Sequence, residues 1–260
     1  MIHPLTNINP NARIAEGVTV ESFTTISGDV EIGEGTWVGP NVTIMDGARI
    51  GKNCRIFPGA VVSAVPQDLK YRGEETLAVI GDNVLIRECV TINKGTAAKG
   101  QTIIGNNCLI MAYVHIAHDC KLGNNVIMVN SVGLAGEITI GDFAYIGGMV
   151  GVHQFVNIGA YTMVQGGSLV GKDIPPFVTA GRSPLQYTGL NLIGLRRRGF
   201  DNNRIDQIHE IYRMIYNQGL NTSQAINEII KEIPHSDDRD DIVNFIRGSK
   251  RGIIKGYLDD

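Results

Sequence analysis

An aliphatic residue recurs at every sixth position over most of this 260-residue chain, and no other feature restricts its possible folds as strongly. Between Ile2 and Val170 the repeat has 29 positions, of which 26 carry Ile, Val, Leu or Met. The exceptions are Asp68, Glu74 and Ala98; they fall in two interruptions, after which the repeat resumes in phase. A hexapeptide period is typical of a parallel β-helix. We therefore expect a mainly β protein with three hexads per turn and an aliphatic interior.

Two further columns accompany the aliphatic one. Glycine often follows the aliphatic residue, as at Gly33 and Gly51, and we expect it there for corner backbone angles that other residues avoid. Small residues lie four places after the aliphatic one, and Cys54, Cys108 and Cys120 belong to this column. We interpret these cysteines as small buried hydrophobes. With no CxxC pair, the four cysteines are expected to be free thiols in a reducing compartment.

The repeat is interrupted near residues 63–79 and 93–103, and both segments are predicted to be loops on an otherwise continuous scaffold. Long loops on a regular scaffold often carry function. The repeat ends before Pro175 and Pro176, which cannot continue a ladder. We therefore divide the chain into a β-helix over residues 1–189 and a C-terminal helical domain over residues 190–260.

Helical spacing of apolar residues replaces the hexads in the C-terminal part. The residues that indicate a buried helix face are Ile205, Ile208, Ile211, Tyr212 and Ile215. Start signals for three helices are Asp201, Asn221 or Thr222, and Ser236, and Gly219 is a stop signal.

Charge and hydropathy exclude several kinds of partner. The net charge is −3 and the pI about 6.1, so the chain lacks the overall basic character of a nucleic-acid-binding protein. No apolar run approaches the roughly 18 residues of a membrane span. The N-terminus has no basic segment followed by an apolar one, and we expect a cytoplasmic protein.

The stretch VHIAHDCKLG, residues 114–123, contains the most informative polar side chains. His118 lies two places after Ile116, so we expect it at an outward wall position. The polar or small residues stacked on this stretch are Gly136 and Glu137 one turn later, and His153 and Gln154 two turns later. This set suits acyl transfer: His118 as general base, Asp119 orienting its imidazole, and the Gly136 N–H facing an oxyanion.

Two alternatives to this interpretation stay open from the residues alone. His118 can be a solvated histidine on the wall of the prism. His115, His118 and His153 can also be zinc ligands, as in hexapeptide-repeat enzymes that hydrate carbon dioxide.

Several runs resemble the UDP-N-acetylglucosamine acyltransferases of lipid A and lipopolysaccharide biosynthesis. They are QDLKY, IRECVTI, HIAHDC, LAG, IGGM, VHQF and GLRRRGF, spread over nearly the whole chain. The resemblance implies a left-handed helix, an exception to the usual crossover handedness. It also implies a homotrimer with active sites between subunits.

The activity implied by the resemblance is transfer of an (R)-3-hydroxyacyl group from acyl carrier protein to the 3-hydroxyl of UDP-N-acetylglucosamine, the first step of lipid A biosynthesis. No cofactor or metal is expected, because the thioester is already activated. The catalytic residues are then His118, Asp119 and Gly136. The substrate-binding residues are Asp68, Lys70, His115, Glu137, His153, Gln154, Asn191, Arg197 and Arg198.

The chain departs from the family pattern at two positions. Glu137 stands where the family often has His, and we expect it to accept a hydrogen bond from a sugar hydroxyl, with His115 or Lys70 offsetting its charge. Ile193 stands where some members place a ribose-binding Glu, which puts that contact in doubt. Gly166 matches the acyl-chain ruler, and its missing side chain favours a long acyl group.

Two other functions were weighed against this one. A related hexapeptide N-acyltransferase of the same pathway is expected to carry an additional N-terminal domain, whereas the hexads here begin at Ile2. A non-enzymatic hexapeptide scaffold has no need of the QDLKY loop or the polar wall.

Overall fold

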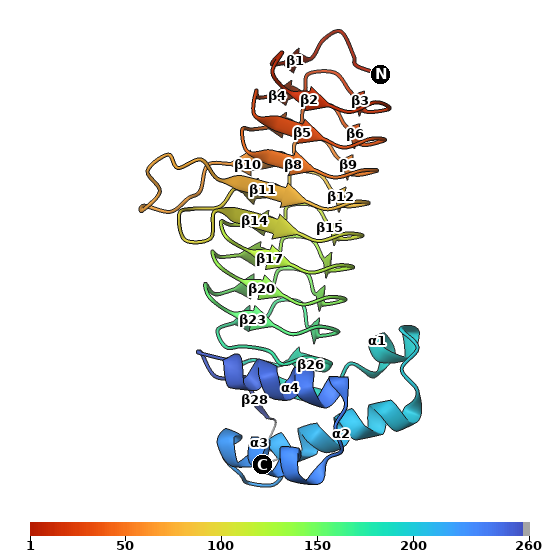
Figure 1. Cartoon of the computed structure of the whole chain (residues 1–260), viewed down its shortest axis with the longest axis vertical. Helices are drawn as coiled ribbons and strands as arrows, with labels where there is room; N and C mark the ends of the chain where they lie inside the picture. The colour runs from red at the N-terminus through yellow and green to blue at the C-terminus, as the bar shows by residue number, and fades with distance from the viewer. Residues whose placement is uncertain (257–260) are drawn as a thin grey trace.

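The computed structural model describes residues 1–256, which form a prism of stacked short strands followed by four helices (Figure 1). Successive turns pair in parallel, and the paired residues lie 18 apart, as in Thr25 with Thr43 and His115 with Gly133. This register confirms that three hexads make one turn. The three strands of each turn belong to three different sheets, which are the three faces of the prism.

The strands of the 9-stranded sheet are β1 (Asn7–Ile8), β4 (Thr25–Ile26), β7 (Thr43–Ile44), β10 (Val61–Ala64), β13 (Thr91–Asn93), β16 (His115–Ile116), β19 (Gly133–Leu134), β22 (Gly151–Val152) and β25 (Leu169–Val170). Those of the 8-stranded sheet are β2 (Arg13–Ile14), β5 (Val30–Ile32), β8 (Ala48–Ile50), β11 (Leu77–Ile80), β14 (Gln101–Ile104), β17 (Lys121–Leu122), β20 (Thr139–Ile140) and β23 (Asn157–Ile158). The 11-stranded sheet contains β3 (Thr19–Val20), β6 (Trp37–Val38), β9 (Arg55–Ile56), β12 (Leu85–Ile86), β15 (Leu109–Ile110), β18 (Ile127–Met128), β21 (Tyr145–Ile146), β24 (Met163–Val164), β26 (Val178–Gly181), β27 (Gln186–Leu190) and β28 (Lys255–Gly256).

The aliphatic column fills the interior of the prism, as predicted. From Val20 to Val170, each of its Ile, Val, Leu and Met residues is at most 4% exposed. Ile2 is 53% exposed and lies at the N-terminal end of the prism. Cys54, Cys108 and Cys120 are buried and unpaired, which confirms their role as small core residues.

The column of glycines has a different cause from the one we expected. Positive φ occurs three places after the aliphatic residue, for example at Asn41 and Asp119, and not at Gly33 or Gly105. A Cβ on Gly33 would lie 2.6 Å from the carbonyl carbon of Gly51 in the next turn. These glycines are therefore needed because successive turns approach closely at this corner.

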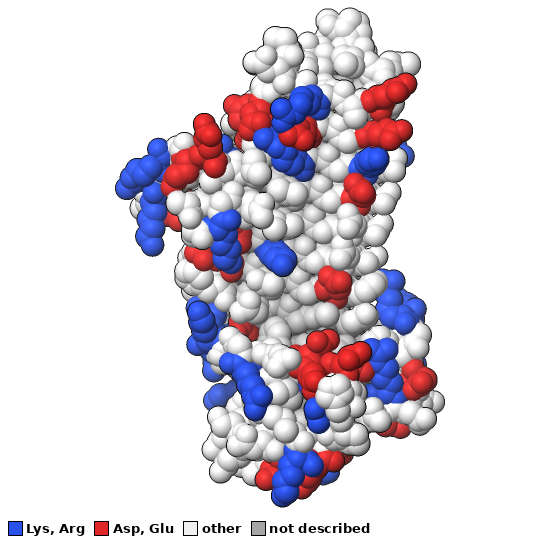
Figure 2. Space-filling model, viewed as in Figure 1, with Lys and Arg blue, Asp and Glu red and all other residues white. Residues whose placement is uncertain are grey.

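Two loops leave the same edge of the prism (Figure 1). Residues 65–76 connect β10 to β11, and residues 94–100 connect β13 to β14. The second loop is tied to the base of the first, because Lys94 N donates to Ala64 O and Gly95 N donates to Leu77 O, both at 3.0 Å. Figure 2 shows charged side chains of both signs on the longer loop.

The helices are α1 (Leu192–Arg197), α2 (Asn202–Tyr216), α3 (Thr222–Glu232) and α4 (Asp237–Gly248). Asp201, Asn221 and Ser236 are the N-caps of α2, α3 and α4, which confirms the predicted starts. Within residues 1–256, no helix combines the length and apolar character that crossing a membrane requires.

The helices pack against the C-terminal end of the prism. The apolar residues predicted from helical spacing form the buried side of α2. Tyr212 is fully buried there, and its hydroxyl donates to Pro176 O at 2.6 Å. The buried carboxylate of Asp173 accepts a 2.6 Å hydrogen bond from Ser249 Oγ, so the segment after α4 is also attached to the last turns.

Candidate active site

The site begins with a histidine and an aspartate on one turn between β16 and β17. His118 Nδ1 lies 2.8 Å from Asp119 Oδ2. The turn has a φ of 60° at Asp119, a left-handed conformation that folds the carboxylate back toward the preceding side chain. The Asp119 side chain is fully buried. A buried carboxylate hydrogen-bonded to Nδ1–H fixes the neutral tautomer that leaves the Nε2 lone pair free.

Asp119 is held by a loop residue that the sequence analysis did not identify. Thr96 Oγ1 lies 2.6 Å from Asp119 Oδ2, and Thr96 N donates to Asp119 Oδ1 at 3.0 Å. Thr96 lies in the 94–100 loop, outside the hexad register, so no spacing rule connects it to Asp119.

His118 is only 7% exposed, which contradicts the alternative of a solvated histidine on the wall of the prism. The hexad phase does place it outside the aliphatic column, but the loops cover the turn. Asp68 of the 65–76 loop places Oδ2 at 3.7 Å from His118 Nε2. The repeat alone contains no information about where a loop folds, which is why the covering was missed.

Gly136 lies directly over the imidazole, as the 18-residue stacking predicted. A Cβ on Gly136 would lie 2.4 Å from both Cε1 and Nε2 of His118. Only glycine therefore fits beside this ring. Glu137 N donates to His118 O at 3.0 Å, which fixes the two turns in register. None of the hydrogen bonds found among the described residues uses the Gly136 N–H.

The remaining polar residues of this corner have separate partners. His115 Nδ1 lies 2.7 Å from Thr91 Oγ1, and burial lowers the pKa of His115, which keeps its ring neutral near pH 7. Thr91 precedes His115 by 24 residues, which is one turn plus one hexad. Counting the 94–100 loop as that extra hexad would have predicted this contact. His153 is exposed, with Nδ1 3.0 Å from Gln154 O.

The 65–76 loop gives Lys70 an indirect role, because its backbone N–H donates to Asp68 Oδ1 at 2.9 Å. The ammonium of Lys70 is exposed. Among residues 1–256, Glu137 forms no ion pair, so neither Lys70 nor His115 is bonded to it.

The three histidines of the zinc alternative each have a different neighbour. Over the described part of the chain, no group of three or more His, Cys, Asp or Glu side chains is arranged to hold a metal ion.

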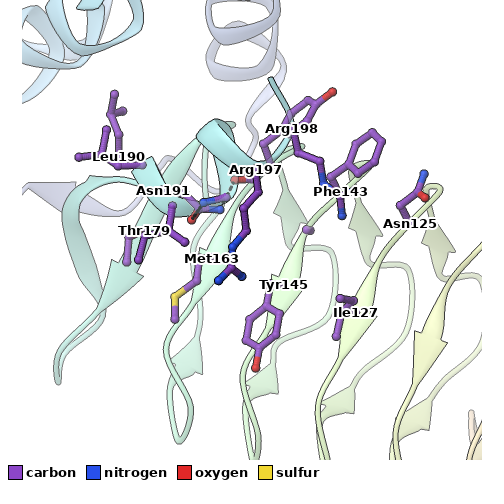
Figure 3. A pocket seen from close by; sticks show the side chains of 15 residues that line it. Asn125, Ile127, Phe143, Tyr145, Met163, Thr179, Leu190, Asn191, Arg197 and Arg198 are labelled. Carbon is purple, nitrogen blue, oxygen red and sulfur yellow. Dashed lines mark hydrogen bonds between the residues drawn. The ribbon is translucent and has the colours of Figure 1, made fainter. Parts of the chain in front are cut away.

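A second group of predicted residues lines a cleft of about 870 Å³ on another face of the prism (Figure 3). Its wall includes Tyr145 and Met163 on the 11-stranded sheet, and Arg197 extends into it from α1. The Arg198 guanidinium lies 4.6 Å from the centre of the Phe143 ring. The cleft therefore combines aromatic and aliphatic walls with two arginines, a composition suited to a nucleotide with a diphosphate.

The side chain of Asn191 is bonded to the backbone at both of its polar atoms. Its Oδ1 accepts from Gly194 N at 3.1 Å as the N-cap of α1, and its Nδ2 donates to Tyr161 O at 2.8 Å. Ile193, which also lines the cleft, is exposed.

The two groups do not meet within one chain. His118 lies at the corner between β16 of the 9-stranded sheet and β17 of the 8-stranded sheet. The arginine cleft lies along β18, β21 and β24 of the 11-stranded sheet. Gly166 is at an exposed corner after β24, where a Cβ would lie 3.1 Å from Gly148 O.

Comparisons with known proteins agree with this arrangement. The family described as "Udp N-acetylglucosamine O-acyltransferase; Domain 2" matches residues 173–254, and the bacterial transferase hexapeptide family matches residues 29–64 and 101–136. Two relatives are named acyl-[acyl-carrier-protein]–UDP-N-acetylglucosamine O-acyltransferase. The protein from Trichlorobacter lovleyi is 48% identical over 98% of this chain and 99% of its own length. The one from Thermodesulfovibrio yellowstonii is 44% identical over 98% and 99%.

Among solved structures, LpxA from Bacteroides fragilis 9343, a UDP-N-acetylglucosamine acyltransferase, superposes with a TM-score of 0.97 at 54% identity, covering 98% of this chain and all of that one. The fold is thus the expected left-handed parallel β-helix with a C-terminal helical region. Because relatives of this similarity extend over nearly its whole length, the chain belongs to the family of acyl-[acyl-carrier-protein]–UDP-N-acetylglucosamine O-acyltransferases.

Proposed function

We propose that this chain transfers an (R)-3-hydroxyacyl group from acyl carrier protein to the 3-hydroxyl of UDP-N-acetylglucosamine, the first step of lipid A biosynthesis. The observation that carries the proposal is the buried pair of His118 and Asp119 with Gly136 stacked on the imidazole. The pair holds a base whose Nε2 faces away from its carboxylate partner. Beside it lies the Gly136 N–H, which has no hydrogen-bond partner among residues 1–256.

In this mechanism His118 Nε2 takes the proton of the sugar 3-hydroxyl while the hydroxyl oxygen attacks the thioester carbonyl carbon. The charge that develops on the carbonyl oxygen is stabilised by the Gly136 N–H. When the intermediate collapses, the carbon–sulfur bond breaks, and the leaving thiolate receives from His118 the proton that came from the sugar hydroxyl. Asp119 stabilises the imidazolium between these two steps. No cofactor takes part, since the thioester already supplies the activated acyl group.

Substrate binding is assigned to the residues around this corner and in the cleft. Asp68, 3.7 Å from His118 Nε2, is suited to hold the sugar hydroxyl beside the base. Lys70, His115, Glu137, His153 and Gln154 offer further hydrogen bonds to the sugar and the acyl donor. Asn191, Arg197 and Arg198 bind the nucleotide, with the arginine forks on the diphosphate.

We infer that the active unit is a homotrimer with sites between subunits. One chain places the histidine corner and the arginine cleft on different faces, so a neighbouring copy that brings its cleft to the corner completes a site. We place the reaction in the cytoplasm, where the four unpaired cysteines are stable as thiols.

The test is an acyl-transfer assay with UDP-N-acetylglucosamine and 3-hydroxyacyl carrier proteins. Wild type should form the 3-O-acyl product, and His118→Ala should lose about 10²- to 10⁴-fold in kcat, the usual contribution of a general base. Product formation by His118→Ala at the wild-type rate would refute the assigned base.

A further inference from the structure

We propose that Thr96 is a positioning residue for catalysis, whose hydroxyl aims the Asp119 carboxylate at His118. The proposal rests on the proposed function, because it assumes that His118 is the base. Thr96 acts through Asp119 and His118.

The direction of each hydrogen bond can be assigned from its neighbours. Ala98 N lies 3.2 Å from Thr96 Oγ1, and a backbone N–H can only donate. The hydroxyl therefore accepts from Ala98 and uses its single proton on Asp119 Oδ2, at 2.6 Å. The same Oδ2 accepts from His118 Nδ1. A continuous set of hydrogen bonds thus links the loop backbone to the imidazole, with Asp119 Oδ2 accepting from both Thr96 and His118.

Thr96 supplies two of the three hydrogen bonds that the Asp119 carboxylate accepts within the described residues, and His118 supplies the third. The carboxylate is fully buried, where an unpaired charge is strongly disfavoured. With both Thr96 donors in place, each carboxylate oxygen has a bonded partner, and the group cannot rotate away from Nδ1. The threonine therefore determines the orientation of the aspartate.

The loop around Thr96 is held firmly enough for this role. Gly100 N donates to Thr96 O at 2.7 Å, and Thr76 Oγ1 donates to Gly95 O at 2.6 Å. The single proton of the Thr96 hydroxyl is used on Asp119, so it is not available as a donor to a sugar nucleotide. Removal of the Thr96 hydroxyl should slow the chemical step and leave sugar binding intact.

The experiment compares Thr96→Val, which removes the hydroxyl at nearly constant volume, with Thr96→Ser, which keeps it. Thr96→Val should lower kcat by about tenfold or more, since a hydrogen bond to a charged group is lost. The KM for UDP-N-acetylglucosamine should stay within about twofold of wild type, because Thr96 acts on the base and not on the sugar. A loss in kcat alone indicates an interaction made in the transition state. Thr96→Ser should have a kcat close to that of wild type.

Thr76→Val is the matched control, because it removes another buried threonine hydroxyl that holds the same loop without touching Asp119. Its kcat should fall much less than that of Thr96→Val, because both bonds from Thr96 to Asp119 remain. Equal losses in Thr76→Val and Thr96→Val would show a general effect on the loop and overturn the proposal. If Thr96→Val does not fold, Thr96→Ala replaces it, and its kcat is again compared with that of Thr96→Ser.

His118→Ala separates the two levels of the argument. An inactive His118→Ala together with a fully active Thr96→Val would leave the proposed function standing and refute the role of Thr96. An active His118→Ala would instead show that the proposed function has the wrong base.

Discussion

Substitution of Gly136 by alanine tests the stacking on which the site depends. The added Cβ would lie 2.4 Å from Cε1 and Nε2 of His118. Non-bonded carbon atoms prefer about 3.5 Å or more, so the ring or the turn must move by about 1 Å. His118 cannot make that movement and keep its bond to Asp119, because both side chains are buried beneath the loops.

A displacement of about 1 Å in a catalytic group can cost on the order of 10²-fold in rate. We therefore expect Gly136→Ala to lower kcat/KM about 100-fold, measured as product formation from a 3-hydroxyacyl carrier protein and UDP-N-acetylglucosamine. The Gly136 N–H is retained in this variant, so the loss measures the position of His118. Overpacking should also lower the free energy of unfolding by about 1–3 kcal/mol.

Gly171→Ala is the control, because a Cβ there meets no atom within 4 Å. It should match wild type in rate and in thermal stability. If Gly136→Ala had the kcat/KM of wild type, the imidazole would not need the space left by the missing side chain of Gly136. The proposed geometry of the base would then be wrong.

Three further predictions follow from other parts of the molecule. Glu137→Ala should raise the KM for UDP-N-acetylglucosamine with little change in kcat; an unchanged KM would exclude the sugar contact. Gly166→Met should shift the donor preference toward shorter acyl chains, read from competition between carrier proteins of different acyl length, and an unaltered preference would refute the ruler assignment. Burial raises the pKa of Cys108 to about 11 and that of Cys120 to about 12, so both stay protonated at pH 8. A thiol reagent should therefore modify the exposed Cys89 first, and Cys108 and Cys120 only after unfolding. Rapid labelling of Cys108 or Cys120 in the native protein would contradict the packed interior.

The stacking of Gly136 on His118 was predictable because the prism has a constant period. Once 18 residues make a turn, His118 and Gly136 must be neighbours, and so must Asp119 and Glu137. The helix starts at Asp201 and Ser236 were also predictable, because a capping side chain bonds to a backbone N–H only a few residues away.

Loop contacts lay beyond this reasoning. The bond of Thr96 to Asp119 and the approach of Asp68 to His118 depend on how two irregular segments fold back over the wall. The glycine column was identified correctly and explained wrongly, since the close approach of Gly33 to Gly51 becomes visible only when the turns are stacked.

The sequence by itself therefore determined the repeating unit, the aliphatic interior and the stacking of Gly136 and Glu137 on His118 and Asp119, because each of these follows from a local period. Only the tertiary structure decided that His118 is buried, that Asp119 is held from a loop, and that the arginine cleft faces away from the histidine. These features depend on contacts between segments with no common register, and on which face of the prism each sheet occupies.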